Sequence, residues 1–302
     1  MELSVLLDPV ILAEVSLQGL IRGSMYGLMA CGLSLIFGLM GVKNFSHGEF
    51  FMLGAYAMFF VAVIMDMPFI LGIGAAAAVL FVFGVLVERT LIRTLRRRAG
   101  REWLLDAFVL TIGLMVVLQN LALLTFGSTR RGVPTLIPGG VEIGPIWLTN
   151  DRLLILVAAI LIVSMLGVFI RYTRMGKAML ATGQHPEAAQ TLGIDINRVY
   201  TYTFGLGAAL AGIAGALLIS IFPAYPTVGF HPVIKSIAAV ILGGLGNVPG
   251  AIAAGVLLGL IEAYTTFFLA SGWQHVITAV LVVLVLIVRP YGLFSSAKGE
   301  RP

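Results

Sequence analysis

The sequence predicts an all-α integral membrane protein that crosses a bilayer about eight times. Of its 302 residues, 59% are hydrophobic and only 11% are charged, whereas roughly a quarter of the residues of a soluble domain are charged. A water-soluble fold of this length cannot hide so much apolar surface. In hydrocarbon, backbone polar groups must pair within their own segment, so apolar runs longer than about 18 residues become helices.

Eight apolar runs are long enough, or nearly so, to span a membrane. They cover residues 24–41, 48–66, 68–88, 104–126, 151–171, 199–221, 250–270 and 273–289. Two further segments, Val10–Leu20 and Pro232–Gly246, are too short for ordinary spans, and Arg22 separates the first from the next run. Both are typical of half-helices or of elements in a cavity wall. We therefore expect one transmembrane domain over residues 1–302, with no separate soluble domain.

The distribution of basic residues predicts the orientation. Three of them, Arg130, Arg131 and Arg152, lie in or just after the long loop at about 127–150, which we expect to be extracytoplasmic. Thirteen occupy the other loops and the tail, namely Arg89, Arg93, Arg96, Arg97, Arg98, Arg101, Arg171, Arg174, Lys177, Arg198, Arg289, Lys298 and Arg301. The C-terminus is then cytoplasmic, which favours Pro232–Gly246 as a short extra crossing, while the side of the N-terminus stays open.

The N-terminal start and the composition exclude several classes of protein. Met1–Ser4 lacks a basic region and a cleavage signal, so the first apolar run should remain in the mature protein. Cys31 stands alone in an apolar run, which excludes a disulfide framework and a cysteine metal site. The net charge of +5 arises from clusters between apolar runs rather than from a continuous nucleic-acid-binding face.

Motifs of catalysis are absent from the sequence. Gly176-Lys177 lacks the upstream glycine of a phosphate-binding loop and is followed by Ala178, so this chain cannot bind ATP by that loop. Neither His-Glu-x-x-His nor Gly-x-Ser-x-Gly occurs, and the four histidines form no ligand pair at helical spacing. We expect no catalytic residue, metal or cofactor on this chain, which disfavours a membrane-embedded enzyme.

Small residues recur at the spacing of helix-packing faces. Gly23 and Gly27 are four residues apart, as are Gly255 and Gly259, and a dense series lies at Gly205, Gly207, Ala211, Gly212 and Gly215. We expect each to serve ordinary packing inside one subunit.

The most informative polar segment is the cytoplasmic loop at about 172–198. Thr173 can cap a first short helix, Pro186 and Glu187 suit the start of a second, and Gly193 suits its end. This second helix, Pro186–Leu192, presents the small residues Ala188 and Ala189, which can enter a cleft on a partner. Anchoring of the loop on the membrane surface is the alternative, and composition alone does not separate the two.

A polar cluster lies at one span junction, and single polar residues lie inside other spans. Asn44, Ser46, His47, Gly48 and Glu49 can line a gate or path, or can form a hydrogen-bonded turn in which Gly48 permits close approach. We expect this junction on the cytoplasmic side.

Glu262 lies about 21 Å along its helix at 1.5 Å per residue. It can line the path or pair with Lys235 or Arg22, and pairing is the safer interpretation. Gln119 and Asn120 are expected to cross-link helices.

The sequence resembles a known family in several motifs. Glu187-Ala188-Ala189, followed after three residues by Gly193, is similar to the coupling motif of ABC-importer permeases. The surrounding segments resemble branched-chain amino-acid permeases of the LivH type rather than the LivM type, and they are Leu192–Val199, Thr203–Phe204, Ala208–Gly215, Gly23–Tyr26, Asn44–Glu49, Gly243–Gly250 and Arg289–Phe294. The resemblance covers roughly residues 10–294. Ser46 departs from it, since the family usually has alanine there, which leaves the detail of ligand choice open.

The resemblance implies a function and a set of partners. The chain would be the permease subunit of an ABC importer in a bacterial plasma membrane, carrying a branched-chain or similar amino acid, urea or an amide. Its partners would be a homologous LivM-type permease, two cytoplasmic ATPases that use ATP, and an extracytoplasmic solute-binding protein. Pro186–Gly193 would transmit ATPase movement. A secondary transporter or channel for small polar solutes is the alternative, which the short segments suit but the scarcity of deep acidic residues disfavours.

Overall fold

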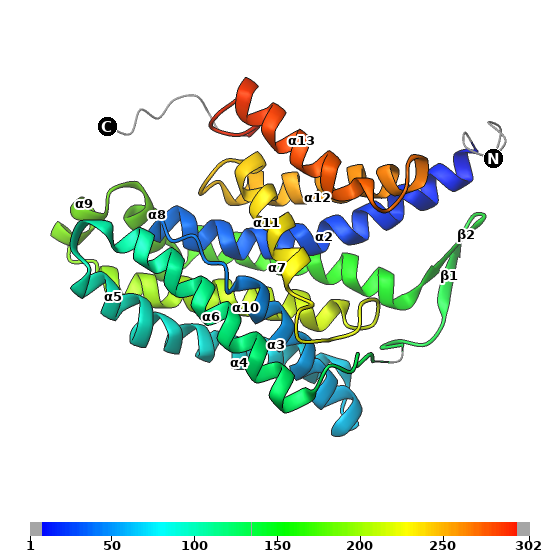
Figure 1. Ribbon diagram of the computed structural model, residues 1–302, viewed down its shortest axis with the longest axis horizontal. Coiled ribbons are helices and arrows are strands. Elements are labelled where there is room, and N and C mark those ends of the chain that lie inside the picture. The colour runs from blue at the N-terminus through cyan, green and yellow to red at the C-terminus, as the bar shows by residue number, and fades with distance from the viewer. Residues whose placement is uncertain (1–7, 134, 295–302) are drawn as a thin grey trace.

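A computed structural model describes residues 8–133 and 135–294 and is a bundle of helices with one β-hairpin in the described part (Figure 1). The predicted start at Met1–Ser4 and the tail residues Lys298 and Arg301 lie outside the described residues. The α-helices are α2 (Pro9–Met40), α3 (His47–Phe59), α4 (Phe69–Val87), α5 (Arg93–Arg98), α6 (Trp103–Phe126), α7 (Asn150–Tyr172), α8 (Arg174–Gln184), α9 (Pro186–Thr191), α10 (Ile196–Leu218), α11 (Phe230–Gly243), α12 (Val248–Phe268) and α13 (Trp273–Val288).

Seven helical segments in the described residues are long and apolar enough to cross a membrane. They are α2, α3 with the π-helical turn Phe60–Ile64, α4 continued through the π-helical turn Glu88–Ile92 into α5, α6, α7, α10 and α12. The shorter apolar helices α11 and α13 complete the bundle. This pattern confirms the predicted polytopic all-α class, with the last predicted run forming a helix of 16 residues.

The predicted break between Val10–Leu20 and the first long run is wrong, because α2 is one continuous helix of 32 residues. Asp8 caps its start by accepting a hydrogen bond from the backbone N–H of Val10, and Gly41, at a φ of 71°, ends it. Arg22 does not interrupt the helix, since a charged side chain leaves the backbone hydrogen bonds intact. A helix of this length extends about 48 Å, which exceeds the roughly 30 Å of a hydrocarbon core.

The long predicted loop at 127–150 contains a hairpin that the sequence did not predict. Strands β1 (Gly140–Ile143) and β2 (Ile146–Thr149) pair antiparallel, with Ile143 opposite Ile146. The same loop is bonded to the segment after α10, because Arg131 and Ala224 exchange backbone hydrogen bonds of 2.9 and 2.8 Å.

The two ends of the bundle differ in character (Figure 1). Helices α5, α8 and α9 lie at one end, which we call the α8–α9 face, and the hairpin lies at the other, the hairpin face. The arginines of α5 and the basic residues of α8 therefore share one face, as the predicted topology requires.

Helices α2 and α12 pack with their backbones in close contact through glycines. A Cβ on Gly255 would lie 2.6 Å from the Cα of Gly27, and one on Gly23 would lie 2.7 Å from the Cα of Val256. Real Cβ atoms do not approach backbone so closely, so these positions admit only glycine. The four-residue glycine spacings therefore serve packing inside one subunit, as predicted.

Helix α10 lies at the centre of the bundle. Its glycine series faces α2 and α4, since a Cβ on Gly207 would lie 3.0 Å from the Gly32 carbonyl oxygen and one on Gly212 would lie 2.8 Å from Leu80. Of the most apolar window of α10, 83% is buried, against 17% for α7. α7 is thus a peripheral helix with a surface suited to lipid, and α10 is the axis of the fold.

Two helices begin inside the bundle rather than at its surface. Residues 41–46 run back from the end of α2, and α3 starts at His47 beside Met29, about 16 Å from the end of α2 at 1.5 Å per residue. α11 starts next to it, because a Cβ on Gly48 would lie 3.0 Å from the carbonyl carbon of Gly229. The short segment predicted at Pro232–Gly246 is thus a half-helix that leads from mid-bundle to the α8–α9 face.

The close contact of α2 and α12 predicts opposite effects for two glycine substitutions. Gly259→Ala places a methyl group against the backbone of Gly23 and should destabilise the fold by about 1–3 kcal/mol. Gly113→Ala on α6 meets no neighbouring segment within 4 Å in the described residues, and should be neutral or stabilise by about 0.5–1 kcal/mol. Thermal unfolding of both variants in lipid nanodiscs measures the difference. Equal melting temperatures would contradict the close contact.

Candidate functional site

The segment between α7 and α10 is built by the capping residues that the sequence predicted. The Thr173 hydroxyl accepts a hydrogen bond of 3.0 Å from the backbone N–H of Gly176 and starts α8. Pro186 occupies the first turn of α9 with Glu187 beside it, which suits the helix dipole. Gly193, at a φ of 84°, ends α9, and the Ile194 N–H bonds the Ala189 carbonyl at 3.1 Å. The predicted short helix therefore exists, one residue shorter than expected.

Helix α9 presents most of its surface to solvent. Pro186, Glu187 and Ala188 are exposed, whereas Ala189 is only 2% exposed and faces the bundle, contrary to the prediction that both alanines are presented. Leu192 is 81% exposed at the end of the helix. Sequence reasoning did not include Leu192 in the site, although an apolar residue amid polar neighbours in a surface helix was an available signal.

Two cavities flank the end of α8 on this face. One of about 710 Å³ lies among α2, α7, α8 and the start of α12, and the other, of about 1140 Å³, lies among α2, α6 and the α8–α9 connection. Gly183 and Gln184 line both cavities, as do Gly38 and Leu39 of α2. The end of α8 therefore has free space on two sides.

A buried ionic cluster that sequence reasoning missed ties the start of α10 to α4. The Thr201 hydroxyl donates a 2.6 Å hydrogen bond to the fully buried carboxylate of Glu88. Arg96 lies 3.5 Å from the same carboxylate, donates to Asn197 at 2.8 Å, and stacks over the ring of Tyr200 at 4.7 Å. The lone glutamate at the end of an apolar run, eight residues before Arg96, was the available signal. These contacts thus tie the first turns of α10 to the segment that continues α4.

The junction Asn44–Glu49 lies in the middle of the bundle, not on the cytoplasmic side as predicted. The sequence suggested a surface turn because a hydropathy pattern does not show whether a polar segment between two helices stays at the surface or returns into the bundle. The His47 ring nitrogen Nε2 lies 3.2 Å from the Met29 carbonyl oxygen, and the Ser46 hydroxyl donates to Asn44 Oδ1 at 2.6 Å. Gly48 permits the close approach to Gly229, as expected of a tight junction.

Polar side chains of α6 satisfy this junction. The Phe45 N–H donates to the Thr111 hydroxyl, which in turn donates to the Lys43 carbonyl. Gln119 donates a 2.9 Å hydrogen bond to Glu49 Oε1, which confirms that Gln119 cross-links helices. Asn120 instead bonds the Val116 carbonyl of its own helix, so its predicted cross-link is wrong.

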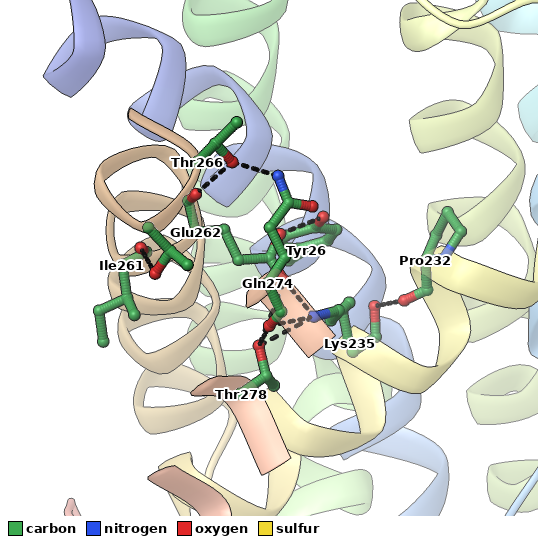
Figure 2. Close-up of polar contacts among 10 residues, drawn as sticks. Tyr26, Pro232, Lys235, Ile261, Glu262, Thr266, Gln274 and Thr278 are labelled. Carbon is green, nitrogen blue, oxygen red and sulfur yellow. Dashed lines mark hydrogen bonds and ion pairs between the residues drawn. The ribbon is translucent and has the colours of Figure 1, made fainter. Parts of the chain in front are cut away.

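Glu262 joins four helices through one buried polar network (Figure 2). Its carboxylate forms an ion pair with Lys235 of α11, the first of the two predicted partners, and accepts a 2.8 Å hydrogen bond from the Tyr26 hydroxyl of α2. Thr278 of α13 donates to the same carboxylate at 3.3 Å and accepts from Lys235 at 2.8 Å. The ion pair holds the half-helix α11 against its neighbours.

The tertiary structure also brings together two histidines that are distant in sequence. The rings of His231 and His275 stack with centroids 5.3 Å apart. Among the described residues, no group of three or more His, Cys, Asp or Glu side chains could hold a metal ion. The polar contacts at Glu49, Glu88 and Glu262 hold helices together.

Loss of one member of the Glu262 pair should destabilise the bundle. Lys235→Met leaves a buried carboxylate without its cation, and removal of one partner of such a pair costs about 3–5 kcal/mol. The double variant Lys235→Met/Glu262→Gln, which leaves no unpaired charge, should recover much of that loss. Thermal unfolding in nanodiscs measures both, with Lys177→Met on the exposed side of α8 as the control. A single variant as stable as the wild type would contradict the role of the pair.

Comparisons with known proteins agree with this architecture. The family model for the branched-chain amino acid transport system permease component matches residues 15–286. The permease protein LivH of the high-affinity branched-chain amino acid transport system of Escherichia coli K12 is 33% identical over 298 residues, which cover 94% of this chain and 96% of LivH. BraD of Pseudomonas aeruginosa has the same identity and coverage. The ribose import permease RbsC of Escherichia coli K12 is 24% identical over 88% of this chain and 82% of its own.

No solved structure matches the chain. The named relatives are transport permeases, not enzymes. Since the family model spans most of the sequence and relatives at 33% identity cover 94% of it, the chain is a multi-pass membrane protein that belongs to the branched-chain amino acid transport system permease family, as a LivH-type member.

Proposed function

We propose that this chain is the transmembrane permease subunit of an ABC importer for branched-chain or similar amino acids. The observation that carries the proposal is helix α9 with the next residue, Leu192, because the part of the chain that the structure describes leaves Pro186, Glu187, Ala188 and Leu192 exposed. The printed function of LivH and BraD supports the substrate class.

The proposed assembly contains a homologous LivM-type permease, two ATPases that bind and hydrolyse ATP, and a solute-binding protein. The α8–α9 face carries the arginines of α5. We therefore assign this face and the C-terminus to the cytoplasmic side of the inner membrane. The hairpin face then meets the solute-binding protein. The chain needs no ATP site of its own, because the ATPase subunits move α9 by binding to it.

The geometry suggests how movement of α9 reaches the translocation path. Only four residues, 192–195, separate α9 from α10, so displacement of α9 pulls on the central helix of the bundle. Arg96 and Glu88 pass the displacement of α10 to α4. The cavities beside Gly183 give the end of α8 room to move, and the path alternates between the two faces.

Bulky residues on α9 should abolish association with the ATPases. We expect Glu187→Phe/Gly193→Phe to lose ATPase copurification while membrane insertion continues. The hairpin offers a matched control, Glu142→Phe/Gly144→Phe, because Gly193 and Gly144 both have positive φ and open space around them. Affinity purification of the assembled complex measures the outcome. Undiminished copurification of the α9 variant would count against docking at this helix.

Uptake by the reconstituted complex should depend on ATP. Proteoliposomes that contain both permeases, both ATPases and the binding protein are expected to accumulate leucine only with ATP on the ATPase side. The half-helix α11, which starts inside the bundle beside the start of α3, is a feature that secondary transporters and channels also use. Leucine uptake by the permeases without any ATPase would therefore favour that alternative and contradict the importer.

A further inference from the structure

Three glutamates lie fully inside the bundle, and they differ in how their charge is balanced. Glu88 has Arg96, and Glu262 has Lys235. Glu49 is 0% exposed, yet no basic side chain in residues 8–133 and 135–294 lies within 4.0 Å of its carboxylate. His47, two residues earlier, is directed to the Met29 carbonyl instead. A buried carboxylate without a cation is costly, and inside a membrane such a group marks a functional site.

Glu49 is also incompletely hydrogen-bonded. Gln119 donates to Oε1 at 2.9 Å, while Oε2 has no hydrogen-bond partner within the described residues. The Gln119 amide offers a dipole to the Glu49 carboxylate, but no positive charge to balance it. The carboxylate therefore retains the capacity to accept a cation that carries N–H donors.

Gln119 is the link between this carboxylate and a cavity that opens toward the hairpin face. The half-buried Gln119 lines a space of about 290 Å³ together with Asn120, Leu123, Ser128, Tyr225, Pro226 and Thr227. This volume lies near the lower end for small-molecule sites. Gln119 lines this cavity and bonds Glu49, which does not line the cavity itself.

A charge of the opposite sign lies beside Tyr225, one of the residues that line the cavity. The guanidinium of Arg130 lies over the ring of Tyr225 at 5.2 Å. A cation therefore lies next to Tyr225 at the cavity, and an unbalanced carboxylate lies beyond Gln119. Such an arrangement suits a small zwitterion whose carboxylate approaches Arg130 and whose ammonium approaches Glu49.

We propose that Glu49 binds the ammonium group of the transported solute, which displaces the Gln119 amide from the carboxylate as it enters the path. This inference rests on the proposed import of amino acids and deepens it by assigning an ammonium-binding residue to the permease. The ammonium group of the solute then balances the charge of the Glu49 carboxylate. When no solute is bound, Gln119 forms a hydrogen bond with this carboxylate.

Glu49→Gln is the decisive variant because glutamine keeps the shape and the hydrogen bonds but removes the charge. In proteoliposomes of the full complex with the binding protein and ATP, we expect leucine uptake to fall at least tenfold while ATPase stimulation by the loaded binding protein persists. Asp106→Asn, at an exposed carboxylate in the first turn of α6, should retain wild-type uptake. Unchanged uptake in Glu49→Gln would overturn the proposal, since a neutral acceptor would then suffice.

A second measurement uses the wild-type protein and does not depend on a variant that folds. Radiolabelled leucine is equilibrated at millimolar concentration with the permease–ATPase complex in nanodiscs without the binding protein. Displacement by 3-methylbutylamine, which keeps the ammonium, and not by 4-methylpentanoate, which lacks it, supports the proposal. Displacement by 4-methylpentanoate but not by 3-methylbutylamine overturns the proposal, as does a failure of leucine to bind. If wild-type complexes fail to assemble or to import leucine with ATP, the proposed function fails instead.

Discussion

Every irregular segment inside this bundle depends on one constraint, which is that backbone polar groups away from water must find partners within the protein. Residues 41–46 and the loop before α11 are not helical, yet Asn44, Ser46 and Ala224 in these segments are buried. Thr111 bonds the backbone of Lys43 and Phe45, and Arg131 bonds that of Ala224. The close packing of the bundle is possible because glycines let α2, α10 and α12 approach at backbone distance.

The same packing concentrates charge at a few depths of the bundle. The Glu88 cluster ties α10 to α4 near the α8–α9 face, and the Glu262 network holds the half-helix α11 among α2, α12 and α13. Each pairs a carboxylate with one cation, as a low-dielectric interior requires. Of the three glutamates buried within the described residues, Glu49 is the one that departs from this pattern, at the place where two helices begin inside the bundle.

These features form one series of helix contacts from the exposed α9 to the polar junction at Asn44–Glu49. α9 is exposed and continues almost directly into α10, the most deeply packed of the helices long enough to span. α10 contacts α2, α3 and α4, and α3 begins at the polar junction that holds Glu49. A force on α9 therefore acts on the helices that surround the junction, while the peripheral α7 keeps its apolar surface toward lipid.

The sequence by itself determined the membrane class, most of the spans and the packing role of the glycines. It also determined the helix ends at Thr173, Pro186 and Gly193. These features depend on hydropathy, capping and small-residue spacing, which are local properties of the sequence. Only the tertiary structure decided the depth of Asn44–Glu49, the continuity of α2, the choice of Lys235 over Arg22 as partner of Glu262, and the cluster of Glu88 with Arg96. Each of these depends on where the chain turns back or on contacts between segments far apart in sequence, which no local pattern encodes.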